Sequence, residues 1–165
     1  MSTRESRDMV PEELIKMVRT YQVLSDLTPE QLRKLLPIAE DQQFEPGEII
    51  FQEGDRSAFL HLIVAGDVAL EETAGGDAVR VQTLHAGEAM GWSALTDGSR
   101  THFQARALTP TSTVAFPGEY LRVACDRNPD MGYALMRNLL DTVTERLDAT
   151  RLQLVRSVKG TCDPD

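Results

Sequence analysis

Apolar positions near the start of the chain recur with helical spacing. Residues 11–20 place proline first, acids next and apolar side chains at positions 14, 17 and 18, which is typical of a short amphipathic helix. A second helix is predicted to begin after Thr28, because Thr28 can cap the first turn and Pro29 suits the first helical position. Leucines at positions 32, 35 and 36 form its apolar stripe, and we expect Pro37 to end or kink it.

From about residue 41 the pattern changes to short apolar or alternating runs, separated by turns that contain glycine. These runs are residues 48–52, 59–64, 68–72, 79–84, 104–108 and 113–116. Their length and alternation predict strands, and many short strands at this spacing predict a β-sandwich or jelly roll. Residues 90–102 do not fit a strand, so we expect an insertion there, which is a natural place for a site.

Helical spacing returns over residues 119–125 and then over residues 129–159, a helix about 45 Å long at 1.5 Å per residue. Its spacing is close to a coiled-coil seam, which consists of Met136, Leu140, Val143, Leu147, Leu154 and Val158, with Thr150 between the last two leucines. The helix could lie along its own domain, as we expect of its first two turns. We favour the interpretation that the seam packs against a second copy of the chain in a homodimer, because the helix is longer than a small sandwich.

Composition favours one globular domain with helical extensions, since 41% of the 165 residues are apolar and 26% are charged. The net charge of −9 disfavours binding to nucleic-acid phosphates or anionic lipid. The start of the chain does not resemble a secretory signal and we find no membrane span, so we expect a cytoplasmic protein. Cys125 and Cys162 lack any metal-ligand or disulfide pattern and are interpreted as free thiols.

Catalytic patterns are missing from the sequence. His61, His85 and His102 form neither an HxH nor an HxxxH pair, and residues 91–95 lack the second glycine of a GxSxG elbow. We therefore expect no metal, no cofactor and no enzyme activity. His61 lies in an alternating strand, where we expect a half-buried or surface position.

Arg100 is the sole basic residue of the insertion. Residues 38–118 carry twelve carboxylates and four arginines, so an anionic ligand would have to be held locally. Arg100 could pair with a phosphate beside the free backbone N–H groups of a short helix that begins after Gly91. Alternatively, Arg100 is a solvated loop residue that balances Asp97.

Three stretches resemble the cyclic-nucleotide-binding domain family: residues 44–55 (FEPGEIIFQEGD), 60–68 (LHLIVAGDV) and 84–91 (LHAGEAMG). That family includes the catabolite activator protein, the regulatory subunits of protein kinase A and the tails of nucleotide-gated channels. The resemblance covers about residues 20–158. It implies a mainly β fold with flanking helices, namely a double-stranded β-helix (jelly roll) with N-terminal helices, a phosphate-binding cassette and a long C-terminal helix.

The cassette departs from the family pattern. Gly91, Ala94 and Leu95 match it, but Trp92 occupies the position of the family's ribose-binding glutamate, and an indole cannot accept a hydrogen bond. Thr101 falls where the family has its phosphate-binding arginine, with Arg100 one residue earlier. We expect these changes to weaken cyclic-nucleotide binding by about two to four decades. The altered motif looks like a recurring bacterial variant with a changed choice of ligand.

Thr150 matches a helix position of the catabolite activator protein whose threonine hydrogen-bonds the adenine amino group across the dimer. Arg151 stands where that resemblance places a partner-subunit serine. Threonine in a coiled-coil seam is also common as a tolerated polar residue, so both interpretations of Thr150 stay open.

The first functional hypothesis is a stand-alone, dimeric regulatory sensor for a small phosphate ligand such as cAMP or cGMP. In it, the backbone N–H groups of Trp92, Ser93 and Ala94 and the guanidinium of Arg100 hold the phosphate. Further hydrogen bonds come from Ser93, Thr101 and His102, while Thr150 contacts the base. Ligand binding then shifts the long helix, which acts on an unidentified protein partner.

The second hypothesis is a ligand-free dimeric scaffold in which Trp92 fills a degenerate pocket. In either case we expect no DNA binding, because the seven residues after Val158 cannot form a winged helix-turn-helix, and no membrane binding. We divide the chain into an N-terminal helical segment (1–40), the jelly roll (41–118), C-terminal helices for dimerisation and signalling (119–159) and a disordered tail (160–165).

Overall fold

The computed structural model of the chain describes residues 11–160. Within them, eight strands form two antiparallel sheets, ordered β1-β8-β3-β6 and β2-β7-β4-β5. The strands are β1 (Glu40–Phe44), β2 (Ile49–Phe51), β3 (Phe59–Ala65), β4 (Val68–Ala74), β5 (Asp77–Leu84), β6 (Ala89–Met90), β7 (Gln104–Ala107) and β8 (Thr111–Pro117). Two sheets with this strand order form a jelly roll, so the predicted fold class is confirmed.

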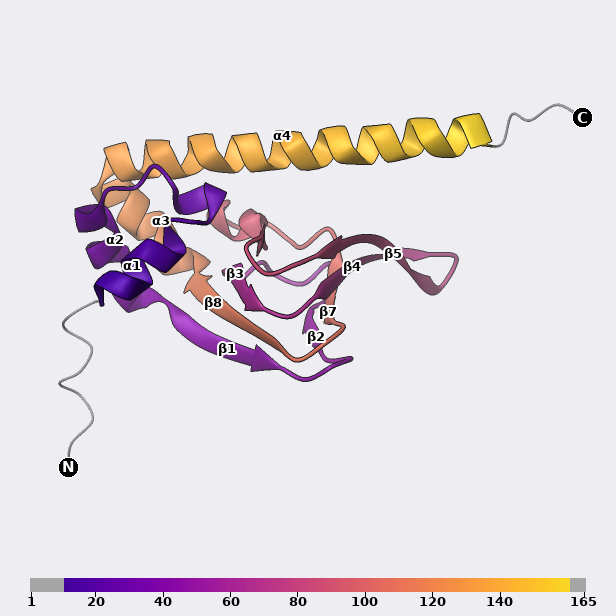
Figure 1. The fold of residues 1–165 in the computed structure, drawn as a ribbon, viewed down its shortest axis with the longest axis horizontal. Helices are drawn as coiled ribbons and strands as arrows, with labels where there is room; N and C mark the ends of the chain where they lie inside the picture. Colours follow the sequence, from indigo (N-terminus) through magenta and orange to yellow (C-terminus); the bar gives the residue numbers. More distant parts are fainter. Residues whose placement is uncertain (1–10, 161–165) are drawn as a thin grey trace, which may run out of the picture.

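Helices precede and follow the sandwich. The first group is α1 (Glu12–Val18), η1 (Gln22–Leu24), α2 (Pro29–Leu35) and η2 (Leu36–Ile38), and the second is α3 (Gly118–Arg127) and α4 (Pro129–Gly160). In Figure 1, α4 runs along one side of the molecule with α1, α2 and α3 beneath its first half, and its last turns extend past the sandwich. None of the helices in residues 11–160 is both long and apolar enough to cross a membrane.

The helix α2 begins at the predicted residue because of a capping box. The backbone N–H of Gln31 donates to the Thr28 hydroxyl at 3.2 Å, and the Thr28 N–H donates to the Gln31 side-chain oxygen at 3.0 Å. Two of the N–H groups at the start of the helix are thereby satisfied. Pro37 lies in η2, where the α-helix has already ended as expected.

Two of the observed strands, β1 and β6, were not predicted from the sequence. β1 has the polar sequence EDQQF, with no apolar alternation, and it forms because it pairs along its whole length with β8. β6 is two residues long, and it takes up Met90, which we had expected to belong to the insertion. Their formation depends on the strands beside them rather than on their own sequences.

The hydrophobic core has two parts. One joins the N-terminal helices, α3 and the start of α4 to β3 and β8, and the other fills the sandwich with Ile63, Val68, Leu70, Leu84, Met90 and Ala105. His61 is 3% exposed, and its Nδ1 lies 3.2 Å from the Thr113 hydroxyl. Our expectation of a half-buried or surface His61 is therefore wrong, because β3 is an inner strand whose residues Leu60 to Ile63 are all buried.

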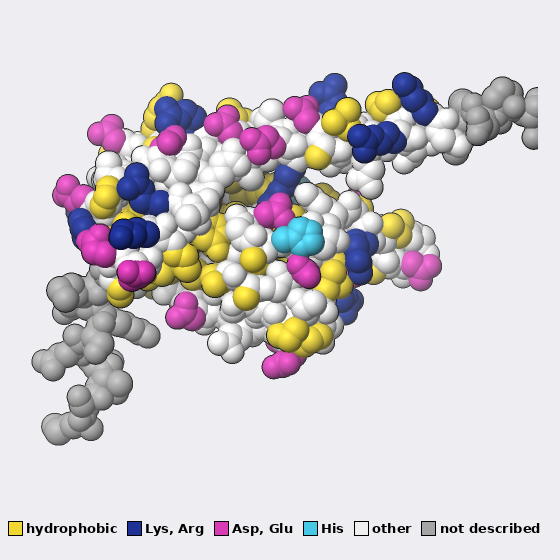
Figure 2. Space-filling view, in the orientation of Figure 1, with side chains coloured by type: hydrophobic (Ala, Val, Ile, Leu, Met, Phe, Trp, Pro, Cys, Tyr) yellow, Lys and Arg dark blue, Asp and Glu magenta, His cyan; other side chains and the backbone are white. Residues whose placement is uncertain are grey.

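Two faces of α4 differ sharply in exposure. Leu135 and Leu139 pack against the domain, as expected of the first turns, whereas Leu140, Leu147 and Leu154 of the predicted seam are 65%, 55% and 63% exposed. Figure 2 shows the far end of α4 clear of the sandwich, with hydrophobic side chains among charged ones. The helix includes Gly160, and the rest of the predicted tail, with Cys162, lies outside the described residues.

Candidate functional site

The segment that we call the cassette, residues 91–101, begins with a backbone turn that requires glycine. Gly91 has φ +80°, and a Cβ at this position would lie 2.4 Å from the carbonyl oxygen of Phe59. A side chain here would be both strained and obstructed. Gly91 thereby sets the direction of the short helix η3 (Trp92–Leu95) that follows it.

Contacts with α3 hold the cassette in place. A Cβ at Gly118 would lie 2.4 Å from the Ala94 carbonyl oxygen, so the start of α3 touches η3 directly. Arg122 donates to the same carbonyl at 2.7 Å, and its guanidinium lies 3.6 Å from the Asp97 carboxylate. Any movement of η3 would therefore disturb α3, which leads into α4.

A cavity of about 300 Å³, which we call the cassette cavity, lies between the cassette and α4. Its volume is at the lower end of the range for small-molecule sites. The wall is mostly apolar, and among the described residues that form it none carries a carboxylate. They are Phe51, Leu70, Gln82, Met90, Gly91, Trp92, Ser93, Thr101, His102, Phe103, Val143, Arg146, Leu147 and Thr150.

Arg146 of α4 and Trp92 of the cassette are in contact with each other in the wall of this cavity. The guanidinium carbon lies 4.4 Å from the centre of the indole ring, a cation–π contact, and Arg146 also donates to the Ala89 carbonyl. Burial lowers the pKa of the Arg146 guanidinium, while the charge of Glu88 acts in the opposite direction. Arginine nevertheless stays protonated at neutral pH, so a positive charge lies on the cavity wall.

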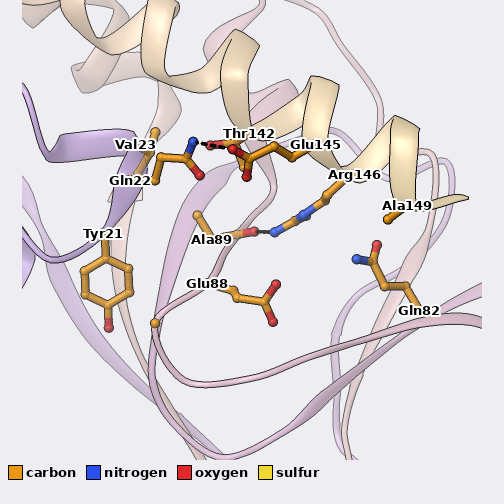
Figure 3. A pocket seen from close by; sticks show the side chains of 11 residues that line it. Tyr21, Gln22, Val23, Gln82, Glu88, Ala89, Thr142, Glu145, Arg146 and Ala149 are labelled. Atoms are coloured by element: carbon orange, nitrogen blue, oxygen red, sulfur yellow. Dashed lines mark hydrogen bonds between the residues drawn. The ribbon is translucent and has the colours of Figure 1, made fainter.

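A second cavity, the flanking cavity, lies on the other side of Arg146 and has a volume of about 260 Å³. Figure 3 shows Arg146 reaching from α4 to the Ala89 carbonyl, with Glu88 and Gln82 below it in the view. Glu145 accepts a hydrogen bond from Gln22 at 3.1 Å. Arg146 and Gln82 line both cavities, so they form the boundary between an apolar compartment and an acidic one.

Most of the residues predicted for the site surround the cassette cavity. Gly91, Trp92, Ser93, Thr101, His102 and Thr150 all line it. The structure brings together residues that are up to 59 positions apart because α4 lies beside the cassette and both line the same cavity.

Several of the predicted hydrogen-bonding groups already have partners within the protein. Ala94 is buried, and its backbone N–H donates to the Gly91 carbonyl at 3.0 Å. The Thr101 hydroxyl donates to the Gln52 carbonyl, and the Ser93 hydroxyl bonds with that of Ser57. The Thr150 hydroxyl donates to the Arg146 carbonyl within α4 at 2.9 Å.

Arg100 lies away from both cavities. Its Nη1 donates to the Gly54 carbonyl at 2.8 Å, and it is absent from the lining of the cassette cavity and of the flanking cavity. The alternative pairing with Asp97 does not form either, because Asp97 lies beside Arg122. Arg100 thus fastens the cassette to the loop after β2.

The sequence analysis missed Arg146, the basic residue of the site. The signal that could have found it is spacing, because Arg146 is four residues before Thr150 and so on the same helix face. The apolar wall from Leu70, Met90 and Phe103 was missed as well, since its members come from three different strands or turns and meet through the fold alone.

Comparisons with solved structures agree with this geometry. A protein from Geobacter metallireducens GS-15, described as cyclic nucleotide-binding, is 30% identical, with a TM-score of 0.72 over 84% of this chain and 99% of the other. The catabolite activator protein of Thermus thermophilus is 26% identical, with a TM-score of 0.68 over 83% of this chain and 63% of the other. A cyclic nucleotide-binding domain from Methylobacillus flagellatus has a TM-score of 0.76 at 20% identity, covers 88% of this chain and 83% of its own, and supports the fold.

A curated relative and a family match complete the comparison. The global nitrogen regulator of Synechococcus elongatus is 27% identical over 107 aligned positions, and the match covers 63% of this chain and 48% of the regulator. The chain thus spans about half the length of that relative. Residues 41–128, just over half of the chain, match the sequence model of the cyclic nucleotide-binding domain. The chain belongs to the cyclic nucleotide-binding domain family.

Proposed function

We propose that this chain is a regulatory sensor domain that binds a small anionic ligand in the cassette cavity and signals through α4. The observation that carries the proposal is the composition of this cavity. In a chain with a net charge of −9, the described lining contains no carboxylate and one arginine. An apolar wall with one cation suits an anion that carries an apolar or aromatic body, as a cyclic nucleotide does.

Ligand choice is proposed to differ from that of the ordinary family cassette. Trp92 lines the cavity rather than filling it, so its ring can stack on a flat ligand but cannot accept a hydrogen bond from a ribose hydroxyl. Arg100 would have to leave the Gly54 carbonyl to reach the cavity. We therefore infer weak binding of cAMP and cGMP, or preference for another anion of similar size.

The signalling part of the proposal depends on α4. Four residues of this helix, Val143, Arg146, Leu147 and Thr150, form one wall of the cassette cavity. A ligand in the cavity therefore contacts the helix directly, and α4 continues for ten residues beyond Thr150. Val143, Leu147 and Thr150 also belong to the seam, so a homodimer formed through the seam would respond to what the cavity holds.

The second candidate is a ligand-free dimeric scaffold. The contact between Arg146 and Trp92 favours it, because the protein itself provides a partner for each of the two groups. In that case α4 would be fixed permanently against the cassette and the exposed seam alone would be functional.

A thermal-shift experiment separates the two functions. The full chain is heated with cAMP, cGMP or a cyclic dinucleotide at millimolar concentration. A ligand at one hundred times its dissociation constant stabilises the folded protein by about 2.7 kcal/mol, which corresponds to a shift of several degrees. A shift with one of the nucleotides supports the sensor. The same melting temperature in all of them would contradict sensing of a cyclic nucleotide and favour the scaffold.

A further inference from the structure

The charge of the cassette cavity comes from α4 and not from the cassette. Arg146 is the single lysine or arginine among the described residues of its wall, and His102 is the one other group there that can become positive. The guanidinium is half-buried, so its charge acts through a medium less polar than water and attracts an anion more strongly. The strongest electrostatic feature of the cavity is therefore carried by the helix.

The hydrogen-bonding capacity of Arg146 is mostly unused. A guanidinium has five N–H donors, and among the described residues one of them has a partner, through Nη2 on the Ala89 carbonyl. The Arg146 guanidinium carbon lies 4.4 Å from the centre of the Trp92 ring, and no second hydrogen bond joins the edges of the guanidinium to a described residue. Such edges bind carboxylates and phosphates in pairs of parallel hydrogen bonds.

No acidic side chain of residues 11–160 neutralises Arg146 by contact. Glu88 and Glu145 line the flanking cavity with it, but neither lies within ion-pair distance of its guanidinium. In Figure 3 the Glu145 side chain turns toward Gln22 instead, and the Glu88 carboxylate lies apart from the guanidinium. A half-buried arginine without a carboxylate partner is a ready site for an external anion.

We propose that Arg146 of α4 holds the anionic group of the ligand in the cassette cavity, with the ligand's flat part against Trp92. This inference rests on the proposed function and names the residue that gives the site its specificity. It makes the ligand a direct link between the cassette and α4, because the anion is attached to the helix itself. Arg100 keeps its structural bond to the Gly54 carbonyl.

The test uses the fluorescence of Trp92, which is the chain's single tryptophan and lies against Arg146. The wild-type full chain is titrated with cAMP, cGMP, inorganic phosphate and inorganic pyrophosphate. The same titrations are carried out on Arg146→Gln, Arg146→Lys, Arg100→Gln and Arg156→Gln. Arg156 provides the matched control, because it is an exposed arginine on the same helix, ten residues farther on. Circular dichroism and a melting curve establish that each variant is folded.

We expect Arg146→Gln to weaken binding of the responsive anion by about ten- to a hundredfold, the loss typical of a charged hydrogen bond. Arg146→Lys should retain part of the affinity, since it keeps the charge without the planar fork. Arg156→Gln should stay within about twofold of wild type, and Arg100→Gln should lose less affinity than Arg146→Gln, because Arg100 holds the cassette from outside the cavity. Wild-type affinity in Arg146→Gln, or a selective loss in Arg100→Gln, would overturn this inference and leave the proposed function standing. A wild-type protein that responds to none of the four anions would overturn both.

Discussion

At the residue scale, Gly91 and His61 illustrate how single positions shape the site. Gly91 combines a positive φ with a carbonyl oxygen 2.4 Å from where a Cβ would be. Gly98, in the same cassette, has φ +70° and no atom within 4 Å of that position. An alanine substitution at Gly98 therefore measures the cost of backbone strain alone, and one at Gly91 measures strain together with a steric clash.

We predict that Gly91→Ala destabilises the protein by about 2–4 kcal/mol, because strain and overpacking add. Gly98→Ala should cost only about 1 kcal/mol, the effect of the left-handed backbone alone. Urea unfolding of both variants measures the difference. Equal unfolding midpoints would show that the Phe59 carbonyl does not restrict the cassette.

His61 makes stability depend on pH. Burial lowers the pKa of His61 to about 4, and the rings of Phe44, Phe51 and Phe59 surround it. An unfolded histidine has a pKa of about 6.5, so the unfolded chain binds the proton first as the pH falls. Stability is therefore present above pH 6.5 and is lost between pH 6.5 and pH 4.

We predict that His61 alone lowers the free energy of unfolding by about 2 kcal/mol between pH 7 and pH 5. His85 acts in the opposite direction, because its hydrogen bond to Asp67 raises its pKa. Comparing wild type with His61→Gln isolates the contribution of His61. If the two proteins lose the same stability over this pH range, the buried histidine is not responsible.

At the element scale, α4 combines three roles. It packs on the domain through Leu135 and Leu139, it lines the cassette cavity through Arg146 and the seam residues Val143 and Leu147, and it leaves the seam exposed at Leu140 and Leu154. The helical spacing of apolar residues over 129–159 predicted α4 and its bounds closely. It could not show which turns meet the cavity, since that depends on how α3 directs α4 across the sandwich.

The seam predicts a specific loss of association. Leu154→Glu should raise the dissociation constant of the dimer by about a hundredfold or more, because each of the two chains loses the burial of a leucine. Leu152→Glu is the matched control, since Leu152 is similarly exposed at 60% but lies off the seam. Sedimentation equilibrium measures both. A wild-type monomer at all concentrations, or equal effects of the two changes, would contradict dimerisation through the seam.

At the scale of the whole molecule, the glycines and alternating strands predicted a β-sandwich or jelly roll, because each turn is encoded locally, and the resemblance to the family singled out the jelly roll. The strands β1 and β6 were not predicted, because their own sequences carry no strand pattern. They form by pairing with β8 and β3. Of the residues that line the cassette cavity, the sequence indicated Gly91, Trp92, Ser93, Thr101, His102 and Thr150. Arg146 was missed, because Arg146 and Trp92 are 54 positions apart and meet only when α4 lies over the cassette.

The central claim is that the cassette cavity holds a small anion. The most direct test is an NMR titration of the ¹⁵N-labelled full chain with cAMP and cGMP, following the single indole N–H of Trp92. The variant Gln82→Phe, which adds a ring to the wall of the cavity, serves as the comparison. The account predicts a saturable shift of the Trp92 signal in wild type and a much weaker response in Gln82→Phe. A Trp92 signal that stays in place throughout, or one that moves equally in both proteins, would contradict it.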